Sequence, residues 1–231
     1  MPDSFSALQK RLGVTFKDPK LLTQALVHRS YLNENRSFAL PHNERLEFLG
    51  DAVLELIVTD HLYRTYDQPE GELTSWRSAL VRGEMLGALA EELAVGDKLM
   101  MSRGEEKSGG RARSQLLANA FEAIIGAVYL DQGYDSAKEF VHRLVLPHLP
   151  EIIDKKLDRD PKSVLQEQAQ ERFGVTPRYQ VEKATGPDHA KQFTISVHVA
   201  DKKLASGGGS SKQQAEQAAA EAALVEWGKQ K

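Results

Sequence analysis

The chain has 231 residues, of which 41% are hydrophobic and 27% are charged, a composition typical of a globular protein with one large or two modest domains. Its formal net charge is −3, and it has no cysteine, which excludes disulfide bonds, thiolate metal sites and cysteine nucleophiles. The sequence has no run of about 18 apolar residues and no apolar stretch typical of a signal peptide, so we expect a cytoplasmic protein without a membrane span.

Residues 6–153 have the apolar spacing of helices almost throughout, with hydrophobic side chains recurring at intervals of three and four. Helix starts are indicated at Asp18 and at Thr74. The polar, glycine-rich residues 102–113 predict a loop. We therefore expect an all-α domain over residues 1–153.

A charged segment with few apolar residues, 154–160, predicts an exposed linker. The pattern then changes to the order α-β-β-β-α, which predicts a small α+β domain over residues 161–229. We expect helices at 162–173 and 211–227, strands at 179–184, 193–199 and 203–206, and a turn at 207–210.

Charge is distributed unevenly between the two parts of the chain. Residues 1–160 have 20 lysines and arginines against 25 aspartates and glutamates, a net charge of −5. Residues 161–231 have 10 against 8, a net charge of +2. This asymmetry permits a mildly basic binding module attached to an acidic body.

Three carboxylates in the first part have helical spacing. Glu44, Glu47 and Asp51 lie within an arc of roughly 60–80° on one helix face. Their neighbours are apolar on most sides, which is typical of a buried helix. Carboxylates stacked on such a helix repel one another and lose hydration, and a divalent cation with oxygen ligands compensates for both effects.

A second apolar helix, expected at residues 115–130, has Asn119 and Glu122 three positions apart. If it packs against the first helix, the two would form a cage of oxygen ligands that binds magnesium and supports attack of water at phosphorus. Spacing alone leaves open a solvated acidic face with Arg45 as an ion-pair partner. A di-iron bundle is disfavoured, because neither helix has a Glu-x-x-His pair.

Residues 43–52 (NERLEFLGDA) resemble the hallmark motif of the ribonuclease III family over ten consecutive positions. Four more stretches resemble the family in the same order, namely 25–31, 70–74, 104–111 and 121–131. The second part resembles a double-stranded RNA-binding domain at 165–167, 186–189 and 207–220. The resemblance covers nearly the whole chain.

This resemblance implies an endoribonuclease that uses magnesium, with manganese as a substitute, and no nucleotide cofactor. It implies cleavage of double-stranded RNA to 5′-phosphate and 3′-hydroxyl ends with short 3′ overhangs, during processing of rRNA precursors and mRNA. Glu47, Asp51 and Glu122 would be metal ligands, and Glu44 would assist catalysis together with Asp51 and Glu122. The catalytic domain would be a homodimer in which Phe48 enters a socket on the partner. Staggered cutting of two strands independently favours two sites related by a two-fold axis.

One position departs from the family pattern, which has Asp where this chain has Asn119. An amide oxygen can join the metal ligands but adds no charge, so metal affinity should be lower. A second function therefore stays open, namely a regulator that binds double-stranded RNA without cutting it.

Duplex RNA is read mainly by its shape, through minor-groove hydroxyls and phosphates. The resemblance implies contacts from the first helix of the small domain, from the loop between its first two strands, and from the start of its last helix, where the helix dipole attracts phosphate. The residues expected to bind RNA are Ser163, Gln166, Glu167, His189, Ser211 and Lys212.

Overall fold

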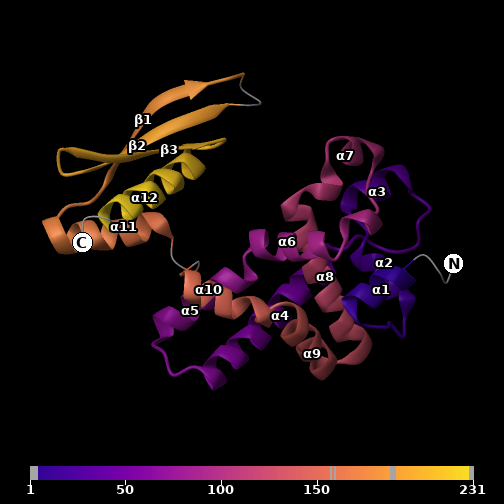
Figure 1. Ribbon diagram of the computed structural model, residues 1–231. Helices are drawn as coiled ribbons and strands as arrows, with labels where there is room; N and C mark the ends of the chain where they lie inside the picture. The colour runs from indigo at the N-terminus through magenta and orange to yellow at the C-terminus, as the bar shows by residue number, and fades with distance from the viewer. Residues whose placement is uncertain (1–4, 157, 159, 188–190, 229–231) are drawn as a thin grey trace. The chain divides into compact units, whose positions relative to one another are not determined.

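A computed structural model of the protein describes residues 5–156, 158, 160–187 and 191–228. The chain forms two compact units, Met1–Asp158 and Arg159–Lys231 (Figure 1). The first is helical and the second combines helices with a sheet, so the predicted fold class is confirmed. Across the described residues, no helix is both long enough and apolar enough to cross a membrane.

The first unit consists of short and long helices around one hydrophobic core. Its α-helices are α1 (Ser6–Leu12), α2 (Pro19–Ala25), α3 (Arg29–Glu34), α4 (Glu44–Thr65), α5 (Glu70–Val81), α6 (Gly83–Glu92), α7 (Arg103–Lys107), α8 (Ser114–Gln132), α9 (Tyr134–Leu144) and α10 (Leu149–Lys155). Helix α10 includes Asp154 and Lys155, the first two residues of the expected linker.

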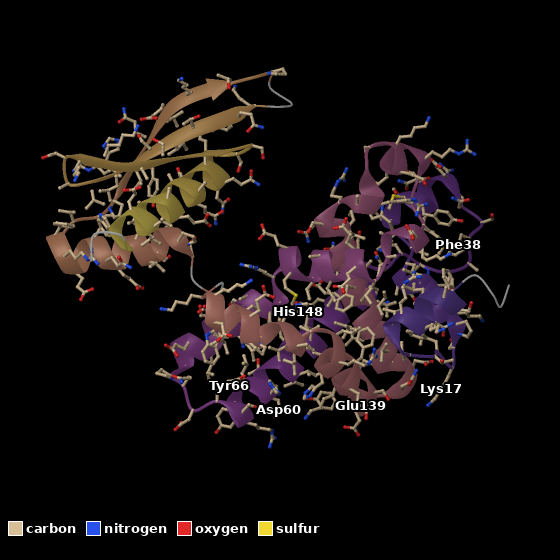
Figure 2. The ribbon with its side chains drawn as sticks, in the orientation of Figure 1. Lys17, Phe38, Asp60, Tyr66, Glu139 and His148 are labelled. Atoms are coloured by element: carbon tan, nitrogen blue, oxygen red, sulfur yellow. The ribbon has the colours of Figure 1, made fainter. Side chains whose placement is uncertain are left out.

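Helix α8 lies at the centre of this unit, in contact with α2, α4, α6 and α9 (Figure 1). All of residues 121–128 are buried except Glu122. Figure 2 labels Phe38, six positions before the start of α4, and Tyr66, which follows its last residue, well apart within the unit. Helix α4 therefore extends across the unit and crosses the buried α8.

Residues at their own N-termini explain where two of these helices begin. Asp18 precedes Pro19, and its side chain accepts a hydrogen bond of 2.9 Å from the amide of Lys20, so the start predicted there is confirmed. The start predicted at Thr74 is wrong, because α5 begins at Glu70, directly after Pro69. Acidic residues in a first turn interact favourably with the helix dipole, and Glu70 supplies such a charge.

The loop predicted for residues 102–113 is also partly wrong, because it contains α7 and the 3-10 helix η2 (Gly110–Ala112). The Ser102 hydroxyl accepts a hydrogen bond from the amide of Glu105 and caps α7. Arg113 donates to Glu105 at 2.6 Å, and Arg111 donates to Glu106 at 2.7 Å. These paired charges order a segment whose composition is typical of a loop.

The second unit has the predicted α-β-β-β-α order. Its elements are α11 (Pro161–Phe173), β1 (Arg178–Thr185), β2 (Gln192–Val199), β3 (Lys202–Gly209) and α12 (Lys212–Gly228). The sheet is antiparallel with strand order β1-β2-β3, and both helices lie on the same side of it (Figure 1). Ile195, Val197 and Val199 of β2 are buried as the alternation predicted, and Phe193 is half-buried.

The turn predicted at 207–210 is wrong for its three glycines, which complete β3. A Cβ added to Gly207 would overlap the backbone of α12 at Ala219, and one added to Gly209 would lie 2.7 Å from the amide nitrogen of Ala215. The alanine-rich face of α12 is buried against this strand. Glycines and alanines thus allow a strand and a helix to lie in backbone contact.

Candidate active site

Helices α4 and α8 cross with their backbones in contact. A Cβ on Gly50 would overlap the carbonyl oxygen of Glu122, and a Cβ on Gly126 would overlap that of Leu46. Each glycine therefore lies against the main chain of the other helix, an approach that a side chain would prevent. The crossing brings the acidic positions on either side of Gly50 next to Glu122.

The structure brings Glu47, Asp51 and Glu122 close enough to perturb one another. Burial, followed by the charges of Asp51 and Glu47, raises the pKa of Glu122 to about 7. Burial also raises the pKa of Glu47, followed by the charges of Glu44 and Asp51. A hydrogen bond from Asn119 opposes this increase in the pKa of Glu47. The charge of Asp51 therefore acts on both Glu47 and Glu122.

A small cavity of about 50 Å³ lies beside Glu47. It is lined by His28, Asn43, Glu44, Glu47, Leu99, Leu116 and Asn119. A water molecule occupies roughly 30 Å³ in the liquid, so the cavity has room for a water or an ion, but not for a nucleotide. Asp51 and Glu122 are not part of this lining.

Glu44 is exposed at the rim and has partners of its own. The guanidinium of Arg29 lies 3.5 Å from its carboxylate, and His42 Nδ1 lies 3.8 Å away. Asn43, which motif reasoning left without a role, is buried. Its amide donates to the carbonyl of Val27 at 2.9 Å, and its side chain donates to the carbonyl of Ala25 at 3.2 Å. Asn43 therefore fixes the start of α4 beside the end of α2.

His28 and Gln115 are further residues at the site that sequence reasoning did not assign. His28 precedes α3 and caps it, since its Nδ1 accepts from the amide of Ser30, so it does not lie inside a helix. Gln115 donates a hydrogen bond of 2.7 Å to the side-chain oxygen of Asn119. Gln115 precedes Asn119 by one helical turn, and this spacing was the only available signal.

The oxygen ligands offered by these carboxylates suit a hard divalent cation. The raised pKa values of Glu47 and Glu122 show that these partly buried groups have too little positive charge near them, and a cation would supply it. Across the described residues, no group of three or more His, Asp or Glu side chains is already arranged as a ligand cluster. The residues that would hold a cation are Glu47, Asp51 and Glu122.

The prediction that α4 is buried on most sides is wrong for one face. Phe48 is 80% exposed, Tyr63 is 78% exposed and Leu56 is 57% exposed. Apolar side chains of this size rarely stay in water on a long helix unless another surface covers them. The sequence pattern could not distinguish burial within the chain from burial against a second one.

The second unit presents most of the expected RNA-binding residues at its surface. Ser163, Gln166 and Glu167 line an open groove along α11, and the Asp160 carboxylate accepts from both the amide and the hydroxyl of Ser163. Lys212 begins α12 and is exposed. The hydroxyl of Ser211 accepts from the amide of Gln214 at 3.2 Å, which gives it a capping role. His189 lies outside the described residues.

Comparison with known families matches both units. Residues 18–149 match the ribonuclease-III-like family, and residues 161–226 match the double-stranded RNA binding motif. The chain belongs to the ribonuclease III family. It is 46% identical to ribonuclease 3 of Pelotomaculum thermopropionicum over 97% of this chain and 93% of that protein. It is 45% identical to ribonuclease 3 of a Roseiflexus species over 97% of this chain and 96% of that one.

A solved structure extends the similarity to the helical unit. The nuclease domain of ribonuclease III from Campylobacter jejuni is 39% identical, with a TM-score of 0.59, and the match covers 64% of this chain and 99% of that domain. That work describes a flexible region involved in dimer formation of the nuclease domain. This ribonuclease III family member is an endoribonuclease with a double-stranded RNA-binding domain.

Proposed function

We propose that the protein cleaves double-stranded RNA with the help of a divalent cation, magnesium in the cell and manganese as a substitute. The observation that carries this proposal is the mutual repulsion of Glu47, Asp51 and Glu122 at a partly buried helix crossing. Holding ionised carboxylates together without positive charge costs free energy, and a bound cation would compensate for that cost.

Each residue has a role in this proposal. Glu47, Asp51 and Glu122 hold the cation, and Glu44, which lies beside Arg29 and His42, assists catalysis together with Asp51 and Glu122. A bound cation would neutralise charge that develops on the phosphodiester. The expected products have 5′-phosphate and 3′-hydroxyl ends with short 3′ overhangs.

The active form would be a homodimer. The exposed apolar face of α4, formed by Phe48, Leu56 and Tyr63, is the part of the helical unit that most requires a cover. A two-fold dimer places one site on each strand of a duplex. The small unit would hold the same duplex through the α11 groove and Lys212, and a contact from His189, outside the described residues, is proposed from the sequence alone.

The test is cleavage of a long, perfectly paired RNA with magnesium and with EDTA. We expect short duplex products only with magnesium, and end analysis should show 5′-phosphates and 3′-hydroxyls. Glu122→Gln should slow cleavage about 100-fold or more, in line with the effect of disturbing a metal site. The matched control is Glu139→Gln, an exposed acid on α9, which should cleave normally.

Two outcomes would contradict this proposal. Cleavage by the Glu122→Gln variant at the rate of the unmodified chain would remove Glu122 from the site. Intact RNA that still shifts on a native gel would favour the alternative, a regulator that binds duplex RNA without cutting it. Processing of rRNA precursors and mRNA remains the expected cellular role.

A further inference from the structure

Three side chains form a hydrogen-bonded chain that ends at the candidate metal site. Gln115 Nε2 donates to Asn119 Oδ1 at 2.7 Å. The side chains of Asn119 and Glu47 line the same small cavity, and a hydrogen bond from Asn119 acts to lower the pKa of Glu47. An ionised carboxylate only accepts, so the group that Asn119 turns toward Glu47 is its N–H. The direction of donation is thus from Gln115 through Asn119 to Glu47.

The orientation of the Asn119 amide decides whether it supports or opposes Glu47. One end of an amide donates and the other accepts, and the surrounding hydrogen bonds determine which end faces which group. With Gln115 donating to the oxygen, the N–H faces Glu47. If the amide turned over, its oxygen would face the carboxylate and two acceptors would meet.

Gln115 packs beside the first residue of α6. A Cβ added to Gly83 would lie 3.5 Å from Gln115 Oε1 and 3.9 Å from Nε2, so the Gln115 amide lies next to the start of that helix. Gln115 is in the first turn of α8, and Asn119 is one turn further on. The helix itself therefore aligns the two amides.

We propose that Gln115 is a positioning residue that fixes the Asn119 amide with its N–H on Glu47, so that Asn119 acts on the metal site through Glu47 and not as a direct oxygen ligand. This inference rests on the proposed function, since it concerns the same site. It also gives Asn119 a purpose. An aspartate there would have two equivalent oxygens and no orientation for Gln115 to set, so Gln115 and Asn119 belong together as a pair.

A double-substitution cycle tests this proposal on the full chain, with Gln115→Ala, Asn119→Asp and both together. Manganese affinity is measured by calorimetry without RNA, and the magnesium concentration for half-maximal cleavage is measured separately. Gln115→Ala should lower manganese affinity roughly tenfold when Asn119 is present, as expected for losing an outer partner of a metal ligand. It should have no effect when residue 119 is aspartate.

The matched control is Gln213→Ala, which removes an exposed glutamine from the first turn of α12 and should leave manganese affinity unchanged. Thermal unfolding in EDTA shows that each variant is folded. An equal loss in both backgrounds, or no loss with Asn119, would overturn the proposal. If manganese affinity changes as expected across the four chains but duplex RNA is left intact, the proposed function alone would be refuted. A chain that binds no manganese would overturn both.

Discussion

Gly50 of α4 lies directly against the carbonyl oxygen of Glu122 in α8, with no room for even a methyl group between them. The reciprocal contact joins Gly126 to the backbone of Leu46. Side chains normally keep packed helices about 8–10 Å apart, and glycines relax this limit. The position of Asp51 relative to Glu122 therefore depends on a contact that involves no functional group.

Gly50→Ala should separate the two helices and disturb the acidic site at the same time. We expect a loss of roughly 1–3 kcal/mol in the free energy of unfolding, because the overlapping atom is backbone and cannot rotate away. Thermal unfolding measures this loss. Gly71→Ala is the control, since nothing lies within 4 Å of an added Cβ there, and it should be neutral or stabilising. Equal unfolding temperatures for the two variants would argue against this account of the crossing.

Without bound metal, the free energy of unfolding should depend on pH because of Glu122. Its pKa is raised from 4.5 to about 7 by burial and then by Asp51 and Glu47, so the folded chain holds a proton that the unfolded chain releases. The resulting stability is present at low pH and is lost as pH rises from about 4.5 through 7. In EDTA, the difference in unfolding temperature between the unmodified chain and Glu122→Gln isolates this contribution. A difference that does not vary with pH would contradict it.

Phe48→Asp should convert a dimer into monomers. The side chain is 80% exposed, so its replacement costs the monomer little packing, whereas a charge at the centre of an interface is strongly unfavourable. We expect the dissociation constant to rise roughly 30-fold or more, which sedimentation over a range of concentrations can measure. Leu130→Asp on α8, where the side chain is 54% exposed, is the control. A monomeric unmodified chain would refute the dimer itself.

Lys212→Ala should weaken binding of duplex RNA without changing its sequence preference. One fewer phosphate contact should lower the slope of log affinity against log salt by about one. The measurement is a filter-binding titration at several salt concentrations, in EDTA to prevent cleavage. Lys202→Ala is the control, because Lys202 begins β3, at the end of the strand remote from Lys212. The same slope for Lys212→Ala and the unmodified chain would exclude this phosphate contact.

Gly207→Ala should unfold the small unit selectively. An added Cβ would overlap the α12 backbone, whereas at Gly208 it would meet only one atom, at 3.8 Å. Gly207→Ala should therefore abolish the contribution of this unit to RNA binding, and Gly208→Ala should retain it. Hydrogen exchange, followed for each unit of the intact chain, shows which one has opened. Protection of α12 in both variants would contradict this expectation.

Sequence reasoning succeeded where the relevant physics is local. Helical periodicity alone placed Glu44, Glu47 and Asp51 on one face, and alternation alone identified the buried side of β2. It failed at Gly207–Gly209, because consecutive glycines are typical of turns, and the need for glycine at positions 207 and 209 comes from a helix that follows later in the chain. It also failed at Thr74, because α5 begins earlier, at Glu70. Pro69, four residues after the end of α4, was the better signal for the start of α5.

Other features depended on contacts that no spacing reveals. The orientation of the Asn119 amide is set by Gln115, a residue that looks like any polar side chain on a helix. The exposure of Tyr63 could not be predicted, since hydrophobicity indicates that a side chain should be covered but not by which molecule, and for Phe48 only the family resemblance indicated a partner.

The placement of the two tryptophans has a practical consequence. Trp76 is buried in the helical unit with its ring centroid 5.2 Å from that of Tyr66, and Trp227 is buried in the small unit beneath Arg172. Since the chain has two tryptophans in all, each unit contains one. Replacing either one with phenylalanine leaves a single tryptophan, so selective excitation of tryptophan follows the opening of one unit without a tryptophan signal from the other.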